Sequence, residues 1–394
     1  MKEAFKNYAA TENNSNWRRI ISRENYLYSR NNDIRSEFER DSTRIVHSTS
    51  YRRLKHKTQV FFSPKNDHIC TRIEHVSHVE SISYTIAKYL GLNVELTQAI
   101  ARGHDMGHSP FGHQGEKILS ELSMRDIGER FWHEKNGLDM VDKFELLIDP
   151  NGIMQNLNLT YAVRDGIISH CGEIDENYLK PRSEYISLEE YQNPNQYSPY
   201  TWEACVVKIA DKISYLGRDI SDAITLGLLD DNLEELREIT DCLSNKVINN
   251  TVLINDFIFD LCKNSTPEQG LCFSDKIFTV VNEIKKFNYK NIYLRDKLIA
   301  ATKYFELILK TIYEFLKETY KNKSKMREIA PELVADFEMW LKNYWNKERD
   351  SINGNCVVFD DIDNEKEYYK AVICYISGMT DNYAMDMYSK IIRF

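Results

Sequence analysis

Residues 99–116 read AIARGHDMGHSPFGHQGE. They continue an apolar helical face that begins after an N-cap at Asn93. His104 and Asp105 stand near the end of that helix, and a loop rich in glycine and proline leads into another helix, expected over about 114–122. A histidine beside an aspartate offers a nitrogen and an oxygen to one metal ion. The stretch therefore predicts a helical fold with a metal site at a helix end.

Helical periodicity extends along the rest of the chain. Apolar residues at spacings of three and four predict a helix over 73–90 and a long one over 202–229. Further helices are expected over 155–170, 231–345 (strongly amphipathic at 296–320) and 366–391, with an irregular segment at 174–200 and a small hairpin or loop at 353–359. With only 15 glycines and 8 prolines among 394 residues, the chain lacks the turns of an all-β protein. The predicted fold class is all-α.

The motifs described below divide the chain in two. Residues 1–230 form the predicted catalytic region, with the motifs at about 40–225, and 231–394 form a helical C-terminal region packed on the same domain. The apolar faces of the amphipathic helices after 231 could pack in the core of the same domain or form an oligomer interface, and the sequence favours neither.

Composition excludes several classes of protein. A hydrophobic fraction of 42% and a charged fraction of 28% rule out a wholly disordered chain. No apolar run is long enough for a membrane span, and the first residues show no secretory h-region. The 8 cysteines form no CxxC pair, which indicates reduced thiols in a cytoplasmic protein. A net charge of −9 argues against strong nucleic-acid binding but allows weak single-strand binding near an oligomer cleft.

The 10 histidines are confined to the first half of the chain, since none follows His170. His75, His104, Asp105 and Asp211 come from three expected helices and suit one octahedral divalent ion, such as Mn, Mg or Fe. A single histidine on a helix is more often a cap or a solvent residue, and an HD dipeptide is common by chance. The order His, then His-Asp, then a distant Asp inside an apolar helix is more specific, because a lone buried carboxylate is costly unless it is paired or bound to metal.

The order H…HD…D resembles the HD-domain superfamily of metal phosphohydrolases. More closely, the chain resembles the deoxynucleoside triphosphate (dNTP) triphosphohydrolases, which include bacterial dGTPases. The similar stretches are RDSTRIVHSTSYRRLKHKTQVF (40–61), NDHICTRIEHVSHV (66–79), AIARGHDMGHSPFGHQGE (99–116), FWHEKNG (131–137), YAVRDGIISHCGE (161–173), VVKIADKISYLGRDISDAI (206–224) and YISGMTDNYAMDMYSKI (375–391). The resemblance implies an HD-domain helical fold with additional C-terminal helices and the same four metal ligands. No such motif is found in 230–365.

Phosphate-binding groups surround the expected metal site. Arg72 precedes His75 by one helical turn, and its guanidinium fork suits a phosphate oxygen. His108 and His113 flank the loop after the HD dipeptide and can face a polyphosphate. The loop is not a P-loop, because His113 replaces the lysine of that motif.

The resemblance also implies a sugar pocket. Asp211, Tyr215 and Asp219 follow one another at intervals of four residues and therefore share one helical face. Polar residues at this spacing ordinarily mark a face exposed to solvent. By resemblance, Tyr215 and Asp219 line the deoxyribose pocket, Lys212 contacts phosphates, and Gln59 reads the 3′-hydroxyl. A tyrosine ring against C2′ would reject ribonucleotides.

The implied reaction is hydrolysis of a dNTP, with dGTP as the model substrate, to deoxynucleoside and inorganic triphosphate. The 5′-oxygen is a poor leaving group, so a general acid is needed. His113, which Glu116 can orient, is the expected proton donor, and His133, beside Glu134, is expected to position water or phosphate. The opposite assignment of the two histidines remains open.

Three other functions compete with this one. An HD phosphohydrolase of another specificity, such as a 5′-nucleotidase or an alarmone hydrolase, would share H…HD…D without needing KTQVF (57–61). A regulatory dNTP-sensing protein would be expected to lack a metal ligand, and all four are present. A nucleic-acid-binding helical protein fits the charge poorly. The resemblance further implies a homo-oligomer.

Overall fold

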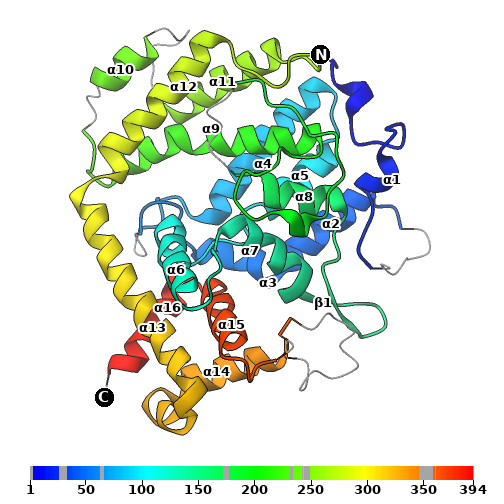
Figure 1. Ribbon diagram of the computed structural model, residues 1–394. Helices are drawn as coiled ribbons and strands as arrows, with labels where there is room; N and C mark the ends of the chain where they lie inside the picture. Colours follow the sequence, from blue (N-terminus) through cyan, green and yellow to red (C-terminus); the bar gives the residue numbers. More distant parts are fainter. Residues whose placement is uncertain are drawn as a thin grey trace.

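The computed structural model describes residues 3–25, 33–62, 66–171, 177–230, 234–241, 243, 249–345, 358–359 and 361–393. These residues are mainly helical, which confirms the all-α prediction (Figure 1). The α-helices are α1 (Trp17–Ile20), α2 (Glu37–His47), α3 (Thr49–Arg53), α4 (Arg72–Leu90), α5 (Val94–Gly103), α6 (Gly112–Asp126), α7 (His133–Asp139), α8 (Tyr161–Ser169), α9 (Trp202–Thr225), α10 (Glu234–Thr240), α11 (Asn250–Asn264), α12 (Asp275–Asn288), α13 (Asp296–Ile329), α14 (Pro331–Lys342), α15 (Glu365–Ser377) and α16 (Asp381–Ile392). Short 3₁₀ or π turns occur at Lys6–Tyr8, Leu54–His56, Met140–Phe144, Leu188–Glu190 and Tyr289–Tyr293. Strands β1 (Leu146–Ile148) and β2 (Met154–Asn156) form one antiparallel hairpin.

The first hydrophobic core is built by α4, α5, α8 and α9, with α2, α11 and α12 packed around them (Figure 1). α4 begins with a capping box between Thr71 and Glu74 and ends at Leu90, where Gly91 follows with a φ of 83° that suits glycine. Asn93 caps α5 by accepting hydrogen bonds from the backbone N–H groups of Glu95 and Leu96, as the sequence predicts. These caps fix where two of the site-bearing helices begin.

α9 carries the last part of the predicted site. The Thr201 side chain caps its first turn, and the helix ends at Thr225 rather than at 229. Gly227 follows with φ 64°, a left-handed conformation that ends helices. α11 and α12 then pack against α9, and α10 packs against α12.

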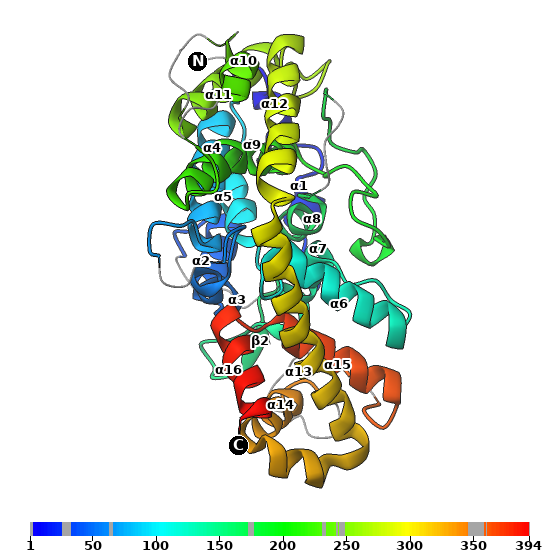
Figure 2. The same cartoon turned by 90° about the vertical axis from the view of Figure 1, so that its left-hand side faces the viewer.

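A second hydrophobic core lies at the other end of the molecule. α13 runs lengthwise between the two ends, with a kink at Asn322 (φ −129°), and α14, α15 and α16 pack beside its lower half (Figure 2). α6, from the N-terminal half of the chain, belongs to this second core, whereas α10–α12 belong to the first. The division at residue 230 stays a prediction.

The prediction of a helix over 155–170 is wrong for its first residues. Residues 154–156 form β2, Asn158 has φ 45°, and α8 begins only at Tyr161. The Arg44 guanidinium donates hydrogen bonds to the backbone carbonyls of Asn156 and Leu157, so these carbonyls are used by a distant helix rather than by a helix of their own.

The helix expected over 366–391 is instead two helices, α15 and α16, separated at Gly378. Thr380 caps α16 through a hydrogen bond from the Tyr383 N–H, which explains the restart. Residues 177–200 are irregular apart from the turn at Leu188–Glu190, as predicted. The hairpin or loop expected at 353–359 lies mostly outside the described residues. Among the described residues, no helix is both long and apolar enough to cross a membrane.

Candidate active site

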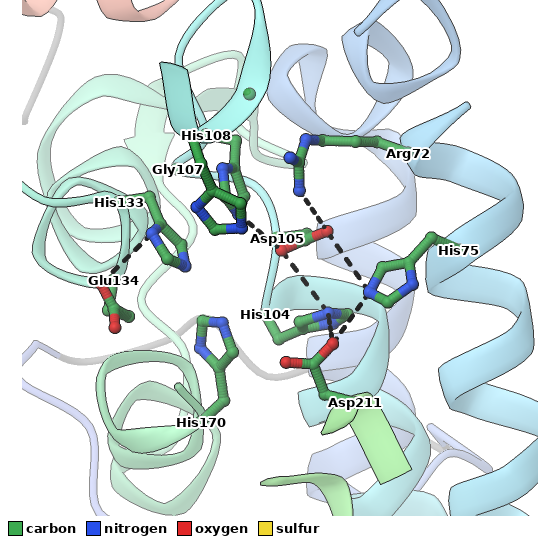
Figure 3. A network of polar contacts seen from close by, with 12 residues as sticks. Arg72, His75, His104, Asp105, Gly107, His108, His133, Glu134, His170 and Asp211 are labelled. Carbon is green, nitrogen blue, oxygen red and sulfur yellow. Dashed lines mark hydrogen bonds and ion pairs between the residues drawn. The ribbon is translucent and has the colours of Figure 1, made fainter. Parts of the chain in front are cut away.

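The four predicted metal ligands meet where α4, α9 and the end of α5 converge (Figure 3). His75 Nε2 lies 2.9 Å from Asp211 Oδ1 and 3.8 Å from Asp105 Oδ2. His104 Nε2 lies 3.6 Å from Asp105 Oδ1 and 3.8 Å from Asp211 Oδ1. Two nitrogens and two carboxylates, drawn from positions 136 residues apart in the chain, thus form one compact cluster. We call these four residues the metal cluster.

The orientation of His104 tests whether the cluster fits a metal. Its Nδ1 donates a hydrogen bond to the Ala101 carbonyl at 2.7 Å, which directs Nε2 away from the helix. That Nε2 is buried and has no hydrogen-bond partner among the residues that the structure describes. An unpartnered buried imidazole nitrogen facing two carboxylates is the arrangement expected of a metal ligand whose other nitrogen is fixed by a backbone carbonyl. The residues therefore fit one divalent ion.

The cluster keeps its carboxylates ionised despite burial. Burial raises the pKa of Asp105, but its electrostatic interactions with His104, His108 and Arg72 outweigh burial and hold that pKa well below its usual range. For Asp211, burial is likewise outweighed, chiefly by the hydrogen bond from His75, and its pKa is about 2. Charged carboxylates are the form that a divalent cation needs.

A second polar group, which we call the relay group, consists of His108, His113, Glu116, His133 and Glu134. Glu116 Oε2 lies 2.9 Å from His133 Nδ1 and 3.3 Å from His113 Nδ1, so one carboxylate serves two imidazoles. The His108 ring stacks on the His133 ring with centroids 3.8 Å apart, and His108 Nε2 lies 3.0 Å from Asp105 Oδ1. His108 thereby connects the relay group to the metal cluster.

The two competing histidines differ in exposure. The His133 side chain is 4% exposed and His113 is 63% exposed. Burial lowers the pKa of His133, but Glu134 and Glu116 raise it well above its ordinary value. Burial raises the pKa of Glu116, but His133 and His113 hold it far below its usual range. His133 is thus enclosed beside the carboxylates of Glu116 and Glu134, whereas His113 can be reached by a ligand.

Comparison with known proteins identifies the family. The model of the HD domain matches residues 72–216. The chain is 32% identical to the deoxyguanosinetriphosphate triphosphohydrolase-like protein of Caldanaerobacter subterraneus subsp. tengcongensis, over 91% of this chain and 86% of that protein. It is 33% identical to the protein of the same name from Desulfatibacillum aliphaticivorans (91% and 88%), and 30% identical to that from Rickettsia prowazekii (91% and 92%).

The chain belongs to the deoxyguanosinetriphosphate triphosphohydrolase-like family. Membership supports a phosphohydrolase activity. The matched HD segment begins at Arg72 and ends beyond Asp211, and so contains the metal cluster and the relay group.

In this family member, the predicted phosphate-binding residues lie beside the metal cluster. Arg72 is 1% exposed and donates a hydrogen bond to Asp105 Oδ2 at 2.9 Å. Lys212 follows Asp211 on α9 and is buried. Arg53, which lies in the stretch 40–61, donates a hydrogen bond to the Gly378 carbonyl at 3.0 Å, which is a structural contact.

We call the face of α9 that carries Asp211, Tyr215 and Asp219 the α9 stripe, and it is not a solvent face. Tyr215 is half-buried against the first core, and Asp219 is buried. Tyr293, from the turn after α12, donates a hydrogen bond to Asp219 Oδ2 at 2.5 Å. Burial raises the pKa of Asp219 to about 7 despite that hydrogen bond. Within the described part of the chain, the buried Gln59 Oε1 has no hydrogen-bond partner, which leaves that atom available to a ligand.

His170 is a site residue that the sequence analysis left without a role. It directly follows α8, and its ring centroid lies 4.9 Å from that of His104 and 5.4 Å from that of His133. Its Nδ1 donates to the Ile167 carbonyl at 2.7 Å, and burial lowers its pKa to about 3. Two features of the sequence pointed to it: it is the last histidine of the chain, and it lies in the stretch YAVRDGIISHCGE (161–173) that carries the family resemblance.

Proposed function

We propose that this protein is a metal-dependent dNTP triphosphohydrolase, which converts a dNTP such as dGTP to deoxynucleoside and inorganic triphosphate. The observation that carries the proposal is the convergence of the metal cluster, the relay group and the α9 stripe. The name of the relatives, deoxyguanosinetriphosphate triphosphohydrolase-like protein, supports the same substrate class.

The metal cluster would hold one divalent ion through His75, His104, Asp105 and Asp211. Such an ion, when bound, supplies a Lewis acid that polarises a phosphoryl oxygen or activates water. Arg72 and Lys212 offset the charge of the triphosphate, and His108 orients Asp105 through its 3.0 Å contact. Arg72 is already held by Asp105, so its guanidinium is oriented before substrate arrives.

The relay group would supply the proton for the leaving 5′-oxygen. We assign His113 as the donor, because it is the exposed member of the group and Glu116 holds its Nδ1. His133, fixed by Glu116 and Glu134, positions water or phosphate from the enclosed side.

The sugar would lie against Gln59, Tyr215 and Asp219. The unpartnered Gln59 Oε1 is suited to accept a hydrogen bond from the 3′-hydroxyl, and the Tyr215 ring excludes a 2′-hydroxyl.

Tyr215→Ala should narrow the preference for dGTP over GTP. Removing the ring removes the steric exclusion, so the ratio of the two kcat/KM values should fall by about 10-fold or more. The matched control is Tyr289→Ala, which removes an exposed ring that packs edge-on to Tyr293 and should leave the ratio unchanged. Full retention of the preference in Tyr215→Ala would place the sugar pocket elsewhere.

We further propose a cytoplasmic homo-oligomer that binds nucleic acid at most weakly. Light scattering of the purified protein with and without dNTP tests the assembly. Turnover of a nucleoside monophosphate or an alarmone in place of dNTPs would favour an HD phosphohydrolase of another specificity, and dNTP binding without turnover would favour a sensing protein.

A further inference from the structure

The turn between α15 and α16 reaches from the C-terminal end of the chain to the active site. We call residues 377–381 the C-terminal corner. Asp381 is its last residue and is 3% exposed. Its Oδ2 accepts a hydrogen bond from the Thr58 N–H at 2.8 Å, and its Oδ1 accepts one from the Phe111 N–H at 2.9 Å. One carboxylate therefore joins two segments that are far apart in the sequence.

Both segments carry proposed substrate residues. Thr58 directly precedes Gln59, and Phe111 lies between His108 and His113. Phe111 has φ 62°, a left-handed conformation that a side chain of this size rarely adopts. Such a conformation persists only where surrounding contacts enforce it, and the Asp381 carboxylate binds the N–H of that very residue.

Further contacts from the same corner reinforce this one. The buried Lys57 Nζ donates to the His108 carbonyl, and to the Ser377 carbonyl at 3.1 Å. The Ser377 Oγ donates to Asn136 Oδ1 at 3.3 Å, and Asn136 in turn donates to the Gly107 carbonyl at 2.7 Å. Hydrogen bonds thus link the corner to the loop after the HD dipeptide at Gly107, His108 and Phe111.

The two loops are also in direct contact. A Cβ at Gly112 would lie 3.2 Å from the Gln59 carbonyl oxygen and 3.1 Å from Arg72 Nη2. With so little space between them, a shift of one loop displaces the other. The group that fixes both backbones at once therefore sets the distance between them.

We propose that Asp381 is a positioning residue, which fixes the spacing between the Gln59 segment and the His108–His113 loop so that the C-terminal corner completes the active site. The proposal rests on the proposed function for the roles of those two loops. It makes the last two helices part of the catalytic unit.

The test compares Asp381→Asn with Asp336→Asn. The asparagine keeps the size of Asp381 but presents an NH₂ group to one of the two N–H donors, so one hydrogen bond is lost. Asp336 is the control: it accepts a hydrogen bond at 2.8 Å from the hydroxyl of Tyr383, two residues beyond the corner, and among the described residues it has no hydrogen bond to either loop. Hydrogen exchange of peptides covering 54–62 and 106–113 should be faster in Asp381→Asn and unchanged in Asp336→Asn.

Activity provides the second measurement. Asp381→Asn should lower kcat/KM for dGTP by about 10- to 100-fold, the effect of a small misplacement of positioned groups, with metal content retained. It should also reduce the discrimination between dGTP and its 2′,3′-dideoxy analogue, because Gln59 no longer meets the 3′-hydroxyl. A merely structural role would not change that discrimination.

Lys57→Met removes the ammonium group that binds the His108 and Ser377 carbonyls. Hydrogen exchange of the peptide 106–113 should therefore be faster in this variant as well. Unchanged exchange in Asp381→Asn, or unchanged kcat/KM and discrimination, would overturn the proposal. If the wild-type protein hydrolyses no dNTP, the proposed function fails, and the exchange of the two loops alone decides whether Asp381 positions them.

Discussion

Asp211→Ala should eliminate both bound metal and turnover. Asp211 lies in the middle of α9, accepts a hydrogen bond from His75 at 2.9 Å, and carries one of the two negative charges that offset a divalent ion. Loss of the ion removes several kcal/mol of transition-state stabilisation, which corresponds to a fall of about 10³-fold or more in kcat. Elemental analysis and steady-state kinetics measure the two effects.

The matched control is Asp222→Asn on the same helix. Asp222 is buried and accepts a hydrogen bond from the Cys70 N–H at 3.0 Å, but it lies outside the metal cluster. This variant should keep its metal even if its stability decreases. An Asp211→Ala protein with stoichiometric metal and normal turnover would reject the assignment of the cluster.

His113→Gln should lower kcat on dGTP by about 10²- to 10⁴-fold, the contribution of a general acid, while metal content stays unchanged. The reason is that the leaving 5′-alkoxide must be protonated, and His113 is the exposed member of the relay group. An analogue with sulfur in place of the bridging 5′-oxygen leaves as a thiolate and needs no proton. On that analogue, kcat of His113→Gln should be nearly the same as kcat of the wild-type protein.

The same pair of substrates distinguishes His113 from His133. His133→Gln should lose activity on both substrates to a similar extent, because a positioning residue acts whichever atom leaves. If the sulfur analogue rescues His133→Gln and not His113→Gln, the proton donor is His133 and the assignment is reversed.

The sequence predicts those parts of the site that depend on local patterns. His104 and Asp105 lie within one continuous string, and His75 shares a helical face with Arg72 one turn away. Asp211 could be predicted because it is an acidic residue within an otherwise apolar stretch of helix. In each case the spacing along one or two helices already determines the face that a side chain occupies.

Features that depend on distant contacts could not be predicted in this way. Residues 155–160 have a helical pattern, yet Arg44 binds two of their carbonyls across more than 100 residues of sequence. Asp381 reaches Thr58 and Phe111 across 323 and 270 residues. His170 gives no periodic signal, and only the end of α8 brings it to His104. Tertiary contacts, rather than propensity, decide such positions.

The measurement that tests the central claim most directly is product analysis in ¹⁸O-labelled water. Gln59 and Tyr215 are assigned to the sugar, and the metal cluster to the phosphate. One ligand can satisfy both assignments only if the phosphate joined to the sugar, Pα, lies at the metal. With dGTP, chromatography and mass spectrometry should therefore show deoxyguanosine and intact inorganic triphosphate, with the label in the triphosphate. Pyrophosphate with dGMP, orthophosphate with dGDP, or label in the nucleoside would contradict this account.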